Sequence, residues 1–439
     1  MRRIENFKRA REALSRLTPV ASFAVSPALA GRLEKMFGTA NPEQAVKSII
    51  NQVRDGGDAA IINLTAQIDG VKLEAIEVPK REISDARRKM DGELLSALKL
   101  AADRIKAFHE KQKDNVCREL AADGAGQLTR PLEKVGIYVP GGTASYPSTV
   151  LMTAVPARVA GVKEVIMATP PGKDAVVPAA TLAAADIAGV DRVFKMGGAQ
   201  AIAALAYGTE SVPRVDKIFG PGNIFVVLAK KLVYGAVAID GLQGPSEVMI
   251  IADETARAEY CAVDLLAQAE HDVLASVILV TTSRALAGEV ERELAKQLKG
   301  LSRQAIINES LKKGVIALVD SIDQAVELAN RYAPEHLCLM VKDADKYLKK
   351  INNAGCVLVG DYATVVLGDY IAGPSHVLPT GGTARFSSPL NITDFIRFIN
   401  TVNIDEAGLK RLGESVIRLA KAEGLDAHAR AVARRLPRG

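Results

Sequence analysis

The sequence predicts an α/β protein with two parallel β-sheets and helical segments at both ends. From about residue 135 to about residue 388, short apolar runs alternate with Ala-rich or amphipathic segments of helical length. This alternation is typical of parallel strands joined by crossover helices. With 439 residues, of which 48% are hydrophobic and 24% charged, the chain is long enough for two or three hydrophobic cores.

The chain before the first strand is predicted to be mainly helical. Residues 1–17 form a basic amphipathic segment with Ile4 and Phe7 on one side. A helical pattern then covers residues 41–108, where Asn41 is a suitable N-cap. A turn-rich stretch follows and leads into the first strand.

Two series of apolar strands come next. The first consists of residues 135–139, 165–169, 191–195 and 217–219, and the second of EVMIIAD, SVILVTT, VIALVD, HLCLMV and GCVLVG, beginning at residue 247. The first series, at about 138–245, is inserted between the helical N-terminal layer and the second series, so the larger domain is predicted to be discontinuous. The tail, 389–439, is expected to be helical and too small to hold a core alone, so it must pack on another domain or another chain.

Composition excludes several classes of function. The net charge of +5 comes from scattered basic residues, and aromatic residues make up 4% of the chain with no Trp, so we expect no nucleic-acid partner. The N-terminus lacks the apolar region of a signal peptide, and the longest apolar runs are of strand length, so we expect a cytoplasmic protein without membrane insertion. The four cysteines form no C-x-x-C pair, which argues against disulfides and a thiolate zinc site.

Histidine is rare enough for its five positions to be weighed one at a time. Gln268 and His271 are three residues apart at a predicted helix end and share one face, which suits a pair of metal ligands but is also common at helix ends. Asp369 follows a strand-like apolar run, and His376 lies seven residues further on. Both are candidates for a site after a strand, although a turn cap and a backbone hydrogen bond explain them equally well.

Glu335 and His336 are adjacent at the entrance of an apolar strand and could act as an acid–base pair. Neighbours in a strand point to opposite faces, so both can serve one site only if the segment after Pro334 is irregular. Taken by itself, His428 is an ordinary exposed helix residue, and His109 has no assigned role.

Three glycine-rich turns offer a possible phosphate site. GIYVPGG, KMGGAQA and IFGPGNIF each follow a strand and open a helix, where backbone N–H groups are unpaired. None of them is G-x-G-x-x-G, so by motif NAD is one candidate among several phosphate ligands.

Taken together, the motifs resemble the histidinol dehydrogenase family in order and spacing from about residue 40 to the C-terminus. The matching segments are VGIYVPGG, GGAQAIAALAYGTESVPRVDKIFGPGN, GPSEV, LLAQAEHD, APEHL, GDYIAGPSHVLPTGGTARFSSPL and AEGLDAHA. The resemblance implies NAD⁺-dependent oxidation of L-histidinol through L-histidinaldehyde to L-histidine, the last steps of histidine biosynthesis. It also implies two incomplete Rossmann-like domains, 18–137 with 246–388 and the inserted 138–245, and a homodimer in which the arm 1–17 and the tail 389–439 intertwine.

The resemblance also implies a set of site residues. One Zn²⁺ per subunit would be held by Gln268, His271, Asp369 and His428. His336 would be the general base and Glu335 would activate a water. These ligands and His336 would bind the substrate together with Ser246, His376 and Glu423, while Tyr138, Gln200 and Asn223 would contact NAD⁺. Glu423 and His428 would complete the site of the partner subunit.

Two alternatives stay open. A sulfopropanediol dehydrogenase-like enzyme would oxidise another small alcohol, but an anionic sulfonate would favour a cation where Glu423 stands. Ser375, where many relatives carry Asn, is a departure from the pattern. A non-catalytic metabolite-binding homologue would have no need of both Glu335 and His336.

Overall fold

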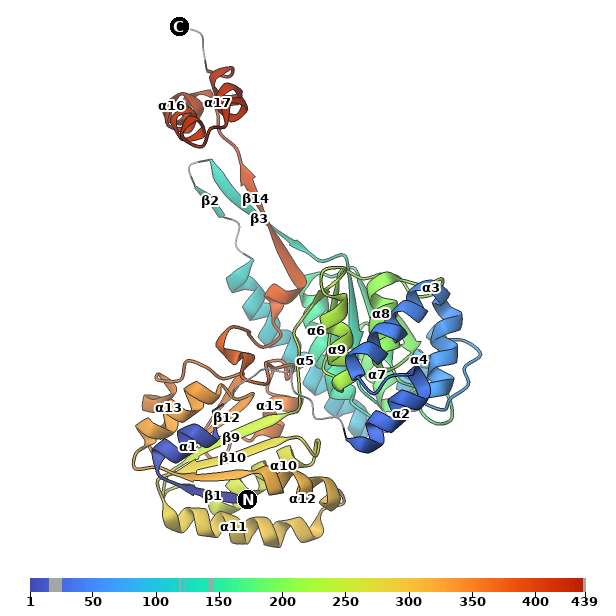
Figure 1. Ribbon diagram of the computed structural model, residues 1–439, viewed down its shortest axis with the longest axis vertical. Coiled ribbons are helices and arrows are strands. Elements are labelled where there is room, and N and C mark those ends of the chain that lie inside the picture. The colour runs from blue at the N-terminus through green and yellow to red at the C-terminus, as the bar shows by residue number, and fades with distance from the viewer. Residues whose placement is uncertain (16–25, 118–119, 123, 142–144, 437–439) are drawn as a thin grey trace.

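The structure confirms the predicted α/β class with parallel sheets. A computed structural model describes residues 1–15, 26–117, 120–122, 124–141 and 145–436. Two α/β units lie against each other, and an arm projects from one of them to a pair of helices at its tip (Figure 1). Within these described ranges, no helix is both long and apolar enough to cross a membrane.

A six-stranded parallel sheet forms the first unit. Its strand order is β1 (Arg2–Glu5), β11 (Val315–Leu318), β10 (Ser276–Thr281), β9 (Glu247–Ala252), β12 (His336–Met340) and β13 (Cys356–Val359). Every residue of β9 is buried, because helices cover both faces of the sheet. Val248 and Ile250 pack into one apolar cluster. Met249 and Ile251, which alternate with them, pack into the other.

The helices of this unit are distributed over both faces. One face carries α10 (Ala258–Ala269), α11 (Arg284–Gln297), η1 (Leu298–Gly300), α12 (Gln304–Lys313) and α15 (Val365–Tyr370). The other carries α1 (Phe7–Ala13), α13 (Ile322–Tyr332) and α14 (Ala344–Leu348). A short helix, η2 (Thr383–Arg385), lies in the connection beyond α15.

A five-stranded parallel sheet forms the second unit. Its order is β6 (Arg192–Lys195), β5 (Glu164–Thr169), β4 (Lys134–Tyr138), β7 (Lys217–Phe219) and β8 (Ala238–Ile239). One face packs on α4 (Lys80–Lys89), α5 (Gly92–Val116), α6 (Pro147–Ala160), α7 (Ala179–Ala188) and η3 (Ile392–Phe395). The other packs on α3 (Pro42–Ile68), α8 (Gly198–Tyr207) and α9 (Ile224–Val233), with α2 (Pro27–Phe37) against α3.

The N-terminus differs from the predicted helix over residues 1–17. Its first residues form β1, which extends the six-stranded sheet beside β11. Asn6 then adopts a φ of 86°, and its side chain accepts a hydrogen bond from the Lys8 N–H at 2.8 Å. This turn stops the strand and caps α1, so the helix in this segment is confined to Phe7–Ala13. The expected boundary between residues 17 and 18 lies outside the described residues.

Helices α3, α4 and α5, which precede β4, pack on the five-stranded sheet, whereas the sequence grouped 18–137 with 246–388. Helices α3, α4 and α5 contact α8, α7 and α6, respectively. Val53 and Ile61 of α3, for example, lie in the same buried cluster as Ile202 of α8. An apolar helix face indicates burial but not the sheet that buries it. The domain boundaries themselves, including 138–245 and 389–439, stay a prediction.

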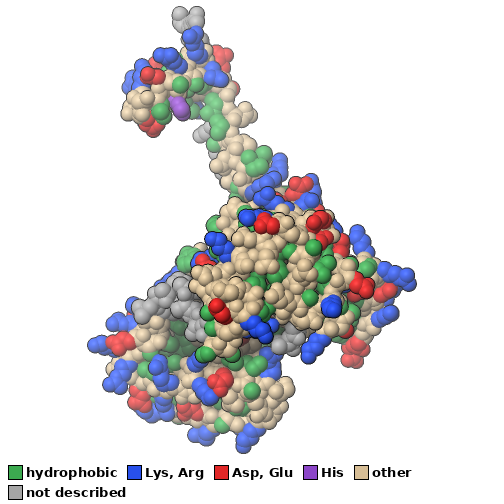
Figure 2. Space-filling model, turned by 45° about the vertical axis from the view of Figure 1, so that its right-hand side comes forward, with side chains coloured by type: hydrophobic (Ala, Val, Ile, Leu, Met, Phe, Trp, Pro, Cys, Tyr) green, Lys and Arg blue, Asp and Glu red, His purple; other side chains and the backbone are tan. Residues whose placement is uncertain are grey.

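The turn-rich stretch and the start of the tail form strands, which the sequence analysis did not predict. β14 (Ile396–Val402) pairs antiparallel with β3 (Ala125–Pro131), and β2 (Leu120–Ala122) pairs with the other edge of β3. These strands make the arm, which ends in α16 (Glu406–Ala422) and α17 (Asp426–Ala433). Apolar side chains stay exposed on the arm and its tip (Figure 2). They include Phe398, Val402, Leu419 and Leu425.

Candidate active site

A cavity of about 400 Å³ lies where the two units meet. Its walls include eight of the side chains predicted for the site: Asn223, Ser246, Gln268, His271, Glu335, His336, Asp369 and His376. In the six-stranded sheet the cavity faces the amino ends of β9 and β12, because Ser246 precedes β9 and His336 begins β12. In the five-stranded unit it faces the loop after β7. The site therefore lies between the amino ends of strands in the six-stranded sheet and the carboxyl end of a strand in the five-stranded sheet.

Glu335 and His336 both reach this cavity although they are adjacent in sequence. Ala333 adopts a left-handed φ of 51° at the end of α13, and β12 starts only at His336. Glu335 therefore lies in an irregular segment just before the strand. This irregular segment is what allows both side chains to reach one site. Both side chains are almost completely buried, with 7% of Glu335 and 4% of His336 exposed.

Hydrogen bonds on both ring nitrogens orient His336. Its Nδ1 lies 3.2 Å from the Glu247 carbonyl oxygen, and its Nε2 lies 3.1 Å from Asp369 Oδ1. A carbonyl oxygen can only accept, so Nδ1 carries a proton and Nε2 is the nitrogen that can exchange one. Burial lowers the pKa of His336, but the carboxylates of Glu335 and Asp369 raise that pKa by more, to well above its ordinary value.

Asp369 responds in the opposite sense. Burial raises its pKa, but the hydrogen bond from His336 and the nearby histidine charges outweigh burial, so the pKa of Asp369 is lowered. The two groups therefore form a buried ion pair between β12 and α15 in the ligand-free chain. Asp369 lies on this short helix, where the sequence analysis expected a strand-like run to end. A ligand that draws Asp369 away removes a charge that raises the pKa of His336, so Nε2 can give up its proton and then act as a base.

Glu247, which the sequence analysis did not single out, holds Glu335 in place. The Glu247 backbone N–H donates to Glu335 Oε2 at 2.7 Å. In return, the carboxylate of Glu247 accepts from the backbone N–H groups of Glu335 at 3.3 Å and Gly381 at 3.1 Å. A signal was present, because an acidic residue opening a fully buried strand needs partners inside the protein.

Gln268 and His271 lie at the end of α10 and line the same cavity as Asp369. Only 1% of Gln268 is exposed, and its Oε1 has no hydrogen-bond partner among the described residues. A buried acceptor without a partner costs about 1–3 kcal/mol, so this oxygen favours a bound ligand. Within the described part of the chain, no group of three or more His, Cys, Asp or Glu residues could hold a metal ion.

His376 ties the two units together across the cavity. Its Nδ1 lies 2.8 Å from the Asp369 carbonyl oxygen, and its Nε2 lies 3.2 Å from Thr149 Oγ1 on α6. Burial lowers the pKa of His376, and the nearby Asp369 carboxylate only partly opposes this effect. His376 is therefore a neutral hydrogen-bonding wall of the site.

A second cavity, of about 430 Å³, contains Tyr138, Gln200 and Asn223. It lies at the carboxyl ends of β4, β5 and β6, where open α/β sheets bind their ligands. The Tyr138 hydroxyl accepts a hydrogen bond from the Gly198 N–H at 3.1 Å, and burial raises the pKa of Tyr138 to about 12. Gln200 is only 1% exposed, yet its Oε1 and Nε2 lack partners among the described residues. Asn223 lines both cavities, so the two spaces meet at this residue.

Two predicted site residues are not brought to either cavity. Glu423 follows α16 and His428 lies on α17, and both side chains are exposed. Figure 1 shows these helices at the tip of the arm, away from both sheets. If these residues serve a site, that site belongs to another chain.

The geometry first defines a class of protein. It is an α/β enzyme in which a buried carboxylate–imidazole pair lines one cavity, and a second cavity, which shares Asn223 with the first, lies at the carboxyl edge of a parallel sheet. Nucleotide cofactors bind at this edge in such folds, and a paired base beside it suits transfer of hydride and proton.

Comparisons with known proteins identify the family. The family model described as histidinol dehydrogenase matches residues 34–436. A histidinol dehydrogenase of Dehalococcoides mccartyi strain CBDB1 is 55% identical over 437 residues, covering 99% of this chain and all of the relative. One from Clostridium acetobutylicum is 51% identical and covers 91% of this chain and 94% of the relative. The crystal structure of histidinol dehydrogenase from Elizabethkingia anophelis matches with a TM-score of 0.91 at 35% identity, covering 99% of this chain and 98% of the other.

The chain therefore belongs to the histidinol dehydrogenase family and is an NAD-type oxidoreductase. This membership confirms the resemblance that the sequence motifs predict.

Proposed function

We propose that the protein oxidises L-histidinol through L-histidinaldehyde to L-histidine, reducing two NAD⁺ and completing histidine biosynthesis in the cytoplasm. The observation that carries this proposal is the meeting of the two cavities at Asn223, with His336 on one side and Gln200 on the other. The two unpaired polar atoms of Gln200 favour the cofactor amide or ribose as partners.

The acid–base pair is suited to both oxidations. In the first, His336 Nε2 takes the hydroxyl proton while the carbinol hydride moves to NAD⁺, giving the aldehyde, NADH and a proton. In the second, Glu335 takes a proton from water as the water adds to the aldehyde. The resulting hydrate loses a hydride to a second NAD⁺, and the acid so formed releases its remaining proton to solvent and leaves as the carboxylate. The hydrogen bonds of Glu335 and His336 with Glu247 hold both groups in position.

We further propose that zinc occupies the site. Gln268, His271 and Asp369 would hold it within one chain, and the unpaired Gln268 oxygen fits this role. His428 of the partner subunit would supply the missing donor. An oxygen and nitrogen donor set without thiolate suits zinc, which would fix the amine and imidazole nitrogens of the substrate. Ser246, His376 and, from the partner subunit, Glu423 would contact the remainder of the substrate.

A homodimer is part of this proposal because the apolar side chains of the tail are not fully covered within one chain. Helices α16 and α17 pack on each other at the tip of the arm and leave apolar side chains such as Leu412, Val416 and Leu419 exposed. A pair of helices of this size does not form an independent core. Docking on a second copy would cover the apolar residues and bring His428 to its site.

Counting NADH produced from limiting L-histidinol by the zinc-loaded protein tests the proposal. We expect two NADH per substrate, with formation lost on chelation and restored by zinc. A yield of one NADH would contradict the second oxidation, and full activity after complete removal of metal would contradict the metal site. Absence of NADH with zinc bound would reject L-histidinol as substrate, and sulfopropanediol would be tried next.

A further inference from the structure

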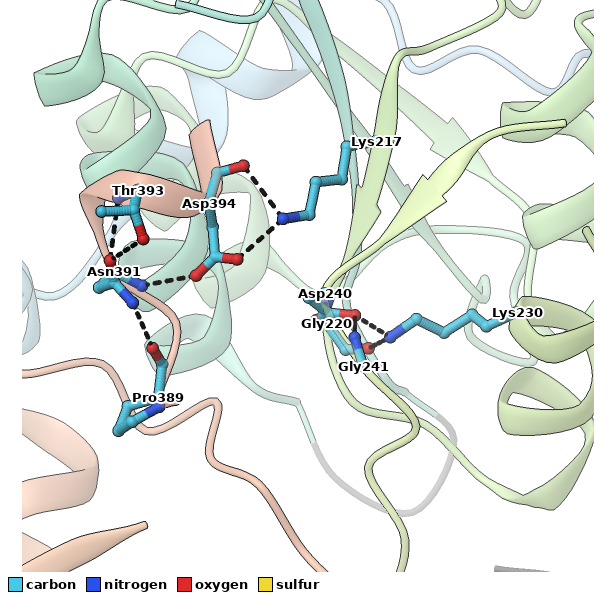
Figure 3. A network of polar contacts seen from close by, with 9 residues as sticks. All are labelled: Lys217, Gly220, Lys230, Asp240, Gly241, Pro389, Asn391, Thr393 and Asp394. Carbon is cyan, nitrogen blue, oxygen red and sulfur yellow. Dashed lines mark hydrogen bonds and ion pairs between the residues drawn. The ribbon is translucent and has the colours of Figure 1, made fainter. Parts of the chain in front are cut away.

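A lysine that takes no part in the proposed chemistry is buried behind the cofactor cavity. Lys230 of α9 is only 1% exposed, and its ammonium group forms an ion pair with Asp240 (Figure 3). Lys230 Nζ also donates to the Gly220 carbonyl oxygen at 2.9 Å and to Gln243 Oε1 at 3.1 Å. Burial lowers the pKa of Lys230, while the carboxylate of Asp240 opposes that shift. Burying a charge is costly unless it is paired, so this arrangement requires a reason.

The pair holds one peptide unit from both sides. Lys230 binds the carbonyl oxygen of Gly220, and Asp240 Oδ2 accepts the Gly220 N–H at 2.7 Å. Gly220 has a φ of +111°, and a Cβ there would lie 2.1 Å from the Tyr138 carbonyl oxygen. The loop after β7 is thus pressed against the backbone of Tyr138. Three residues later it places Asn223 at the junction of the two cavities.

The same lysine also contacts the segment that returns to the substrate unit. Gln243, its third partner, lines the 400 Å³ cavity. The next residue, Gly244, donates its N–H to Thr380 Oγ1 at 2.6 Å, and Ser246 follows. Lys230 therefore joins the loop 220–223 on the cofactor side to residues 243–246 on the substrate side. Among the described residues that line these two cavities, neither Lys230 nor Asp240 occurs.

We propose that Lys230 is a positioning residue that, acting with Asp240 through Gly220, sets the loop 220–223 for cofactor binding. This inference rests on the proposed function, because it assigns the cavity of Tyr138 and Gln200 to NAD⁺. The lysine aligns that cavity with the substrate cavity without touching either ligand. Well-packed apolar residues often replace a buried ion pair without loss of stability, so the stability of the fold alone does not account for the Lys230–Asp240 pair.

The test is Lys230→Met, which keeps an unbranched side chain of similar length and removes the ammonium group. NAD⁺ affinity is measured by calorimetry without substrate, and KM values are measured for both substrates. We expect NAD⁺ to bind about tenfold more weakly or worse, since a hydrogen bond from a charged donor is lost. The KM for NAD⁺ rises accordingly and by a larger factor than the KM for histidinol, while the zinc content and the dimer mass are unchanged.

Lys217→Met is the matched control. Lys217 stands on β7 of the same sheet and pairs with Asp394 at 2.8 Å, but it lines neither cavity (Figure 3). Its loss removes a lysine–aspartate pair without releasing the loop 220–223, so NAD⁺ affinity should match that of the wild type. Equal weakening in both variants would overturn the proposal.

A double variant, Lys230→Met with Asp240→Asn, separates positioning from stability. Removing both charges leaves no unpaired buried carboxylate, so thermal stability should recover relative to Lys230→Met. NAD⁺ affinity should stay weak, because the Gly220 carbonyl oxygen still lacks its donor. Recovery of both together, or unchanged affinity in folded Lys230→Met, would refute the role. Failure of the wild type to bind NAD⁺ would instead refute the proposed function.

Discussion

Replacing Gln268 with Met should make the metal-free protein more stable while weakening its binding of zinc. The Gln268 side chain is 1% exposed, and its Oε1 is buried without a partner among the described residues. Methionine has a similar length and no polar group to leave unsatisfied. Removing this oxygen should recover about 1–3 kcal/mol, the cost of a buried unpaired acceptor. In thermal melts this gain corresponds to a rise in Tm of about 2 °C or more.

The assay compares thermal unfolding of wild type and variant after exhaustive chelation, and again after zinc is added back. Gln304→Met on α12 controls for the change of residue type, because Gln304 is exposed and its Nε2 donates to the Lys299 carbonyl oxygen at 3.1 Å. We expect no rise in Tm for this control. Zinc should raise the Tm of the wild type more than that of Gln268→Met, since only a ligand that binds the folded state stabilises it. A metal-free variant less stable than wild type would refute the reasoning.

Three further predictions address the acid–base pair and the cofactor cavity. His336→Asn should lower turnover by about a hundredfold or more, measured as NADH formation, and retained turnover would exclude His336 as the base. Zinc content by elemental analysis and dimer mass by light scattering should not change. Gln200→Met should weaken NAD⁺ binding in calorimetry and stabilise the ligand-free protein, because both polar atoms of Gln200 lack partners among the residues that the structure describes. Tighter NAD⁺ binding would contradict this assignment. In metal-free protein, the Tm advantage of wild type over Asp369→Asn should be greatest between about pH 4 and 6.5. Because the pKa of His336 is raised, this Tm advantage is lost as the pH rises through that pKa. Because the pKa of Asp369 is lowered, the advantage is also lost as the pH falls through the pKa of Asp369. A Tm advantage that grows with alkaline pH would contradict the ion pair.

The parts of the fold that the sequence predicts well are those in which burial dictates the pattern. Every residue of β9 is buried, so its apolar run predicts a strand without information about the neighbouring strands. Of the missed strands, β1, β2 and β14 lie at sheet edges, whereas β3 is central in the three-stranded sheet. β1 reads RRIE, with only Ile4 buried, and becomes a strand because β11 offers an open edge. β14 is mostly exposed and depends on β3, which is far away in the chain.

The site shows the same division between local and distant causes. The motif around His336 indicates acid–base chemistry, but the meeting of His336 with Asp369 depends on how α15 folds back on β12. Local sequence also cannot show that Glu247 binds the backbone of Glu335, since the two residues are brought together only by the pairing of β9 with β12. Spacing alone left the metal-ligand set open; only the family resemblance implies it, and it stays a prediction.

The unpaired polar atoms explain why the site lies between two units rather than inside one. Gln200 belongs to the five-stranded unit and Gln268 to the six-stranded unit, and each buries an acceptor that no group in the described part of the chain satisfies. Each such group lowers stability by about 1–3 kcal/mol, so the ligand-free protein is less stable than its packing allows. Because the cost is divided between two separate cores, neither core has to bury both unpaired glutamines. Ligands that satisfy both glutamines would then draw the two units together across Asn223, which places the hydride donor and acceptor in one enclosed space.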